Sequence, residues 1–289
     1  MTPSYLRNIL SLLGLFIVFV QCTDGSVSGE AVTTRFWDCC KPSCSWNGKG
    51  PLSKPVTSCD KDDKPLADVN AGTGCNGGTA YSCSDQQPWA VNDTFSYGFA
   101  GIFIQGHVED FWCCACYQLD FTSDPLRNKT MIIQASNTAY DINTANRFSL
   151  AVPGGNTTSH DACAKQFGVD QTVFGETNTG ISSIDDCDNL PEQLQAGCRW
   201  RFDWFQDASY PRYVCPFPQP STYLMFYSAN FKRVVCPAEL TTKTGCSRND
   251  DKELGSGKTS TATITKSSPS SSLVASLSMM IASLLSVYR

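Results

Sequence analysis

Hydrophobic and polar positions between residues 27 and 250 follow the spacing of short strands more often than that of helices. Apolar residues alternate with polar ones or form brief runs, and Gly, Pro and Asn interrupt them every several residues. This pattern is typical of a loop-rich β protein. Helical periodicity is scarce, and the best short helix candidate is Ile184–Leu194. We therefore predict a mostly β fold with strands at Phe99–Ile104, Cys116–Phe121, Met131–Ala135 and Arg199–Trp204.

Two further apolar segments lie outside this region. Near the N-terminus, an apolar segment from Ile9 to Val20 follows Arg7. It leads into Val20-Gln21-Cys22, a candidate cleavage site. We predict that residues 1–22 are a signal peptide, because the segment is shorter than the ~20 apolar residues of a membrane span. At the other end, we predict a Ser/Thr-rich linker over residues 251–272.

The apolar C-terminal tail, residues 273–289, has three interpretations. It fits a lipid-anchor signal with Ser260-Thr261-Ala262 as the attachment site, because a polar spacer separates small residues from an apolar tail. A weak transmembrane helix and a tail without a targeting role are the alternatives. The predicted location is extracellular, with cell-surface attachment if the anchor is made.

Composition narrows the classes of function. The chain has 289 residues, 41% of them hydrophobic and 17% charged, which suits one folded domain over residues 27–250. Its net charge of −5 disfavours nucleic acid as a partner. Sixteen cysteines in a secreted chain predict disulfides. Sequons at Asn92, Asn128 and Asn156 are candidate glycosylation sites.

We expect no cofactor, no metal and a monomer. The only two histidines, His107 and His160, lack the spacing of metal ligands and are interpreted as surface or polar-network residues. No glycine-rich phosphate loop and no serine in a nucleophile elbow is present in the sequence.

One stretch carries most of the chemical information. In Thr33-Thr34-Arg35-Phe36-Trp37-Asp38-Cys39-Cys40-Lys41-Pro42-Ser43-Cys44, a carboxylate follows two aromatic residues and a cation, and cysteines follow it at once. Aromatic rings pack on the apolar faces of sugars, while Arg and Asp bind hydroxyl groups. The stretch thus predicts a rigidly held Asp in a sugar-binding cleft.

The stretch resembles the active-site signature of glycoside hydrolase family 45 endoglucanases, or cellulases. The resemblance continues in order through nearly all of residues 33–250. Its further blocks are Tyr81–Asn92, Trp112–Tyr117, Pro153-Gly154-Gly155, Gly180–Ser183, Cys198–Phe205 and Cys236–Leu240.

The resemblance implies a six-stranded double-psi β-barrel with long disulfide-stapled loops, few short helices and an open groove. It also implies seven disulfides, and leaves Cys22 and Cys215 without a partner. The implied pairs are Cys39–Cys163, Cys40–Cys75, Cys44–Cys113, Cys59–Cys83, Cys114–Cys246, Cys116–Cys236 and Cys187–Cys198.

The implied activity is inverting hydrolysis of internal bonds of a β-1,4-glucan polysaccharide. Inversion needs one carboxyl to activate water and another to protonate the leaving oxygen. Asp38 matches the general base, and Asp141 is the nearest match to a second groove Asp. The substrate-binding candidates are Thr34, Arg35, Phe36, Trp37, Lys41 and the sugar-stacking Trp46.

The chain departs from the family at the acid. The family places it in a His-Phe-Asp-Leu block, which reads Arg147-Phe148-Ser149-Leu150 here. A serine hydroxyl does not protonate a leaving sugar oxygen at ordinary pH, and loss of general acid catalysis costs about 10²–10⁴ in rate. Phe36 also replaces the usual Tyr.

Three interpretations follow from Ser149. The chain is a glucan-binding or wall-loosening pseudoenzyme on the same barrel, a hydrolase that recruits Asp141 or Asp161 as its acid, or a slower or specificity-shifted hydrolase. We commit to an endoglucanase-type enzyme whose activity must be tested.

Residues 212–227 are interpreted as a translated intron. The segment is apolar, rich in Pro and contains the odd Cys215. Its ends can be encoded by splice-site sequences, and removal of its 16 codons preserves the frame. A genuine surface loop is the alternative, since loops tolerate insertions.

Overall fold

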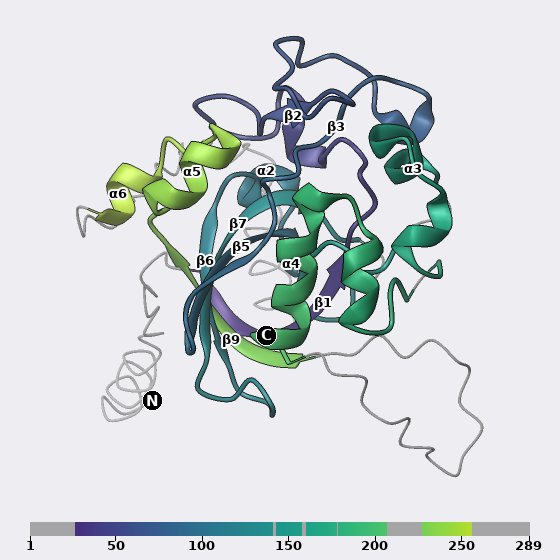
Figure 1. Ribbon diagram of the computed structural model, residues 1–289. Helices are drawn as coiled ribbons and strands as arrows, with labels where there is room; N and C mark the ends of the chain where they lie inside the picture. The colour runs from purple at the N-terminus through teal and green to yellow at the C-terminus, as the bar shows by residue number, and fades with distance from the viewer. Residues whose placement is uncertain (1–26, 141–142, 158–159, 178, 207–226, 256–289) are drawn as a thin grey trace, which may run out of the picture. The chain divides into compact units, whose positions relative to one another are not determined.

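Six strands close into a β-barrel. A computed structural model describes residues 27–140, 143–157, 160–177, 179–206 and 227–255. The barrel strands are β1 (Ser28–Phe36), β5 (Phe95–Phe103), β6 (Cys116–Phe121), β7 (Thr130–Thr138), β8 (Arg147–Ala151) and β9 (Tyr227–Val234). They pair in the order β5, β7, β6, β9, β1, β8 and back to β5 (Figure 1). The mostly β, six-stranded double-psi barrel that the family resemblance implies is therefore confirmed.

Alternation of side chains explains the barrel interior. Along β9, buried Tyr227, Ala229 and Phe231 alternate with exposed Ser228, Asn230 and Lys232, as the period of a strand requires. Rings from three different strands then meet inside the barrel. Tyr117 lies 5.5 Å from Phe148 and 6.0 Å from Phe231, measured between ring centroids. These contacts fix the strands that carry the site.

Strand pairing sets which residues lie side by side at the site. β1 runs parallel to β8, with Thr34 opposite Ser149 and Phe36 opposite Ala151. β8 also pairs antiparallel with β5, which completes the ring. The active-site signature at the end of β1 thus lies next to the strand that carries the altered acid position.

Short elements surround the barrel, and the longest helix among the described residues, α4, has 12 residues. The remaining strands are β2 (Ser58–Cys59), β3 (Tyr81–Ser82) and β4 (Trp89–Asn92). The helices are α2 (Glu109–Trp112), α3 (Ala162–Phe167), α4 (Glu192–Asp203), α5 (Ala238–Thr244) and α6 (Asp251–Gly255). Single 3₁₀ turns are η1 (Ser43–Ser45), η2 (Gly74–Asn76), η3 (Gln171–Phe174) and η4 (Asp185–Asn189).

Three of the four strand predictions are confirmed, and the fourth is wrong. β6 matches its predicted range, and β5 and β7 contain theirs except for Ile104. Residues 199–203, in contrast, form the last part of α4. Trp200 and Trp204 alternate with Arg201 and Asp203 as in a strand, but they are also four residues apart. In the helix this spacing stacks their rings 5.4 Å apart.

The helix predicted at Ile184–Leu194 is only partly present. Residues 185–189 form the 3₁₀ turn η4, Pro191 follows, and α4 begins at Glu192. Proline fixes its own φ and disfavours a helical conformation in the residue before it, so the two helical segments are separate.

Seven disulfides staple the loops, and they join the same seven pairs that the family resemblance implies. Five of them connect cysteines at least 35 residues apart, while the shortest closes a segment of 11. The pairs are Cys39–Cys163, Cys40–Cys75, Cys44–Cys113, Cys59–Cys83, Cys114–Cys246, Cys116–Cys236 and Cys187–Cys198.

Several predicted segments lie outside the described residues. These are the signal peptide, the C-terminal tail, Asp141, Cys22, Cys215 and all of 212–227 except Tyr227. Tyr227 is buried at the start of β9, and its ring packs edge-on against Phe205 at 5.1 Å. Removal of the segment would therefore also take one residue from the barrel. Within the described residues, no helix has both the length and the apolar character needed to cross a membrane.

The folded domain extends slightly into the predicted linker. Residues 251–255 form α6, and Arg233 of β9 forms ion pairs with Asp250 at 2.9 Å and Asp251 at 2.5 Å. These contacts hold the start of the linker against the barrel, so 251–255 belong to the folded domain.

Candidate active site

Asp38 follows the end of β1 and is held in place from both sides. The next residue, Cys39, has a φ of 57°, in the left-handed region that side chains other than glycine rarely adopt. Disulfides tie Cys39 to Cys163 and Cys40 to Cys75. The backbone N–H of Cys40 then donates a hydrogen bond of 3.0 Å to Oδ1 of Asp38. The paired cysteines thus fix the direction of the carboxylate.

The carboxylate faces a small cleft at one end of the barrel. The cleft is built from the end of β1, strand β3, strand β7 and the end of β8. Its lining residues are Phe36, Trp37, Asp38, Cys40, Pro42, Ser82, Gln86, Ser136, Asn137 and Ala151. Three of the predicted site residues, Phe36, Trp37 and Asp38, are therefore brought together here.

Burial raises the pKa of Asp38 above its ordinary value. The Cys40 N–H and the positive charge of His160 act in the opposite direction, and burial outweighs both. A carboxylate with a raised pKa is a stronger base than a solvated one, and it takes up a proton nearer to neutral pH. Asp38 therefore has the properties of a general base.

Position 149 has a different environment. Ser149 is 4% exposed, and its hydroxyl accepts a hydrogen bond of 3.0 Å from Oγ1 of Thr34. The buried Arg147 donates to the same Thr34 oxygen from Nε at 2.9 Å and from Nη2 at 2.8 Å. Thr34, a predicted substrate contact, is thus 3% exposed and belongs to this internal network. Neither Thr34 nor Ser149 lines the cleft of Asp38.

Asp161 precedes α3 and is engaged elsewhere. Its carboxylate forms an ion pair with Lys165, one helical turn further on, with 2.7 Å between Oδ1 and Nζ. The hydrogen bond from Lys165 lowers the pKa of Asp161, so this carboxyl gives up its proton readily and holds none near neutral pH. The environment of Asp161 therefore does not suit a general acid.

Lys41 and Trp46 form a pair next to the signature. The Lys41 ammonium lies 3.4 Å from the centre of the Trp46 ring and donates to the carbonyls of Val69 at 2.6 Å and Ala71 at 3.0 Å. Lys41 is 4% exposed, so its described contacts hold the 69–71 loop and the Trp46 ring. Arg35, the last of the substrate-binding candidates, is half-buried.

Several cleft residues are not predicted from the sequence. Ser136 and Asn137 lie on β7, and the Asn137 side chain accepts a hydrogen bond of 2.9 Å from the backbone N–H of Ser43. Gln86 is 2% exposed and donates to the Thr57 carbonyl at 2.7 Å. Gln86 lies in the Tyr81–Asn92 block of the family resemblance, and that block is the sequence feature from which its place at the site could have been predicted. No motif indicates Ser136 and Asn137, and only the position of β7 in the barrel brings them to the cleft.

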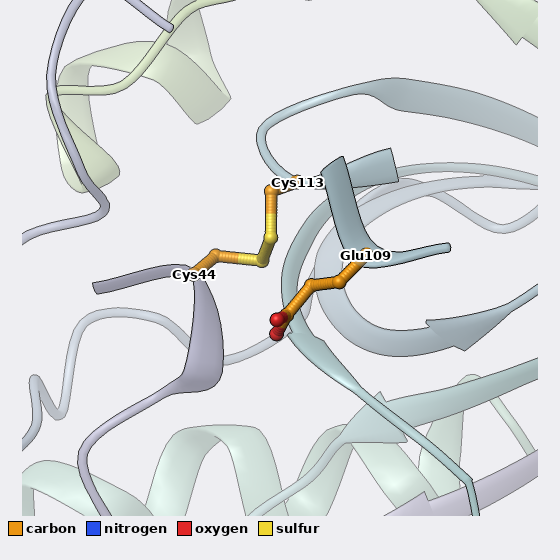
Figure 2. Close-up of side chains that lie close together, drawn as sticks. All are labelled: Cys44, Glu109 and Cys113. Carbon is orange, nitrogen blue, oxygen red and sulfur yellow. A yellow bond between two sulfur atoms is a disulfide. The ribbon is translucent and has the colours of Figure 1, made fainter. Parts of the chain in front are cut away.

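A second group of side chains supports the cleft from behind. Figure 2 shows the carboxylate of Glu109 next to the Cys44–Cys113 disulfide. The two sulfurs are bonded to each other and so do not supply thiolate ligands. Glu109 instead pairs with Lys49 and accepts a hydrogen bond of 2.9 Å from Oγ1 of Thr138. Since Thr138 follows Asn137, Glu109 helps to fix the wall of the cleft.

Comparisons with known proteins agree with this geometry. The profile of glycosyl hydrolase family 45 matches residues 29–247. A putative endoglucanase type K of Fusarium oxysporum is 43% identical over 85% of this chain, and the match spans 60% of that relative. An endoglucanase of Cryptopygus antarcticus is 42% identical over 79% of this chain and 94% of that relative. The crystal structure of the cellulase from this Antarctic springtail has a TM-score of 0.67 and covers 77% of this chain and 99% of that one.

Proposed function

The chain belongs to glycosyl hydrolase family 45, and from that premise we propose that it is an endo-β-1,4-glucanase with Asp38 as its general base. The observation that carries the proposal is the carboxylate of Asp38 at the cleft, oriented by the Cys40 N–H and with a pKa raised by burial. Curated relatives named as endoglucanases support the substrate class, a β-1,4-glucan.

The proposed reaction is a single displacement with inversion. Asp38 removes a proton from a water molecule while the water oxygen attacks the anomeric carbon. The bond from that carbon to the leaving oxygen breaks, and the leaving oxygen takes up a proton. Phe36 and Trp37 line the same cleft and offer aromatic surface to a sugar ring. The reaction needs no group other than water, glucan and the protein.

Release of reducing ends from mixed-linkage glucan and carboxymethyl-cellulose tests the proposal. We expect the full-length protein to release them, and Asp38→Asn to lower the rate by about 10²–10⁴ because the base is lost. Proton NMR of the first product should show the α-anomer, as inversion requires. A wild-type protein that releases no reducing ends from either glucan, at any pH between 4 and 8, would refute the proposal.

A glucan-binding pseudoenzyme is the second candidate function. It is favoured by Ser149, whose hydroxyl is buried in the network with Thr34 and Arg147. Binding to insoluble cellulose together with a rate on soluble glucan no higher than that of Asp38→Asn would support this alternative. Binding alone does not distinguish the two functions, because both require a groove.

Secretion is part of the proposal. Seven disulfides in the described residues are typical of proteins that fold in an oxidising compartment. Asn92 and Asn128 have exposed side chains and suit glycans, whereas the side-chain oxygen of Asn156 is buried. We therefore propose glycans at Asn92 and Asn128 only, with mass spectrometry of the secreted protein as the test. The tail as a lipid anchor and residues 212–227 as a retained intron remain proposals for mass spectrometry and transcript sequencing.

A further inference from the structure

The leaving oxygen needs a proton donor, and the carboxyl candidates do not supply it in the described residues. Ser149 has a hydroxyl within a buried network. Asp161 is ionised by its pairing with Lys165. Loss of the general acid would cost about 10²–10⁴ in rate. A donor must therefore be sought among other side chains near Asp38.

The chain that approaches Asp38 from the other side is residues 156–163. It is tied to the signature at both ends. The carbonyl of Asn156 accepts a hydrogen bond of 2.9 Å from the backbone N–H of Trp37. Cys163 is joined to Cys39, with their Cα atoms 5.0 Å apart. The two residues of the signature that make these ties, Trp37 and Cys39, flank Asp38 in the sequence, so Asn156 and Cys163 are both held close to it.

His160 lies between the two ties and is exposed to solvent. It precedes Cys163 by three positions, so the disulfide to Cys39 keeps residue 160 near the residue that follows Asp38. Its positive charge also acts to lower the pKa of Asp38. The two residues are more than 100 positions apart, and only the implied Cys39–Cys163 disulfide connects their segments in the sequence analysis. The interpretation of His160 as a surface or polar-network residue agrees with its exposure but does not connect it with Asp38.

We propose that His160, as an imidazolium, is the general acid that donates a proton to the leaving glucoside oxygen. The inference rests on the proposed hydrolytic function and assigns the role that Ser149 leaves vacant. Imidazole is suited to it, because it exchanges a proton in the range of about pH 5–8, whereas a serine hydroxyl does not. The exposed position of His160 leaves it accessible to a polymer in the cleft.

The proton and electron balance closes without another reactant. The attacking water gives one proton to Asp38, and its oxygen forms the new bond to the anomeric carbon. The broken bond leaves its electron pair on the leaving oxygen, which takes the proton of His160. Asp38 then releases its proton to solvent and the neutral imidazole takes one up, which restores both groups.

Two carboxylates interact electrostatically with His160 among the described groups. Asp38 and Asp161 both interact with its charge, and Lys165 is paired with Asp161. The rate should rise with pH as Asp38 ionises and fall as the imidazolium loses its proton. The proposal therefore predicts an alkaline limb that depends on the presence of His160.

The test compares His160→Gln with His107→Gln in the full-length protein. His107 is the only other histidine, and it is exposed and stacked on Phe111 at 3.7 Å. Each variant is assayed on mixed-linkage glucan and on a dinitrophenyl β-cellotrioside, whose leaving group needs no proton. We expect His160→Gln to lose about 10²-fold on glucan and less than about 10-fold on the aryl glycoside. His107→Gln should match the wild type on both.

The pH profile separates a catalytic role from a structural one. In His160→Gln the alkaline limb on glucan should disappear, while the acid limb of Asp38 remains. Equal losses on both substrates, or a rate on glucan within twofold of the wild type, would overturn the inference. So would an alkaline limb that persists in His160→Gln and disappears in Asp141→Asn. An inactive wild type would instead refute the proposed function itself, which keeps the two failures distinct.

Discussion

Asp38 follows the end of one barrel strand and Ser149 lies in the strand next to it, but their surroundings differ in exposure, charge and hydrogen bonding. Asp38 follows the end of β1 at a cleft, with a pKa raised by burial and its direction fixed by the Cys40 N–H. Ser149 lies within β8, 4% exposed, in a hydrogen-bonded network with Thr34 and a buried arginine. The carboxylate of Asp38 thus remains at the cleft, whereas the hydroxyl of Ser149 is enclosed in the barrel. The proposed hydrolysis therefore needs an acid from another segment.

Loss of the disulfide next to Asp38 should have the largest effect, and this effect is on the free energy of unfolding. Replacing Cys39 and Cys163 together by Ser removes a crosslink across 124 residues, for which the chain-entropy relation gives about 5 kcal/mol of unfolding free energy. The matched control replaces Cys187 and Cys198, which close a segment of 11 residues and should cost about 3 kcal/mol. Denaturant unfolding measures both. Equal losses would contradict the expectation that the longer span gives the larger stabilisation.

Introducing a carboxyl group at position 149 should have the next largest effect, and this effect is on the glucanase rate. A carboxylate introduced by Ser149→Asp would face the buried Arg147, which would keep its pKa low and make it a poor acid. When Ser149→Asp is added to His160→Gln, we expect the glucanase rate to rise by less than about 10-fold over that of His160→Gln alone. Adding Arg147→His should raise recovery to about 10–100-fold. Full recovery by Ser149→Asp alone would show that Arg147 does not act on position 149.

The raised pKa of Asp38 has a consequence for stability as well as for catalysis. A carboxyl whose pKa is higher in the folded state stabilises the fold when protonated, and this contribution is lost as pH rises through the folded-state pKa. At neutral pH the ionised Asp38 therefore costs stability. We expect Asp38→Asn to raise Tm by a few degrees at pH 7, and to raise it less near pH 3. A lower Tm at pH 7 would contradict the burial argument.

The smallest effect is expected far from the site, at the end of the folded domain. Burial opposes the ionisation of Asp250, but hydrogen bonds from Arg248 and Arg233 outweigh it and lower its pKa to about 2. The stability that Asp250 contributes is present above the ordinary pKa of an Asp and is lost as pH falls towards 2. Because Asp250 is partly exposed, Asp250→Asn should cost only about 1 kcal/mol at pH 7. Thermal unfolding of the variant at pH 7 and pH 2.5 checks the sign, since the difference should be clearly smaller at the lower pH, where much of the contribution of Asp250 is already lost.

The barrel could be predicted because several specific motifs carry a family resemblance, and not because periodicity alone resolves it. Alternation identified β6, whose side chains truly point in and out. The same rule failed at residues 199–204, because apolar residues at every second position also fall four apart, and burial against the barrel selected the helix. Local patterns therefore determine an element only where tertiary contacts agree with them.

The candidate site could be predicted only in part. Asp38, Phe36 and Trp37 are adjacent in the sequence, so one motif shows all three. His160 comes near Asp38 through a crosslink between Cys39 and Cys163, and Thr34 meets Ser149 through pairing of β1 with β8. In both pairs the two residues are more than 100 positions apart, so a local sequence pattern does not predict that they are neighbours.

The closed ring also determines the order of events during biosynthesis. β1 pairs with β9, so the first strand has no antiparallel partner until residues 227–234 have been synthesised. Cys59–Cys83 and Cys187–Cys198 span 24 and 11 residues and can oxidise early, whereas Cys114 and Cys116 must wait for Cys246 and Cys236. Contacts between distant segments make folding slow and expose apolar strands meanwhile. The barrel therefore cannot close until almost the entire folded domain has been synthesised.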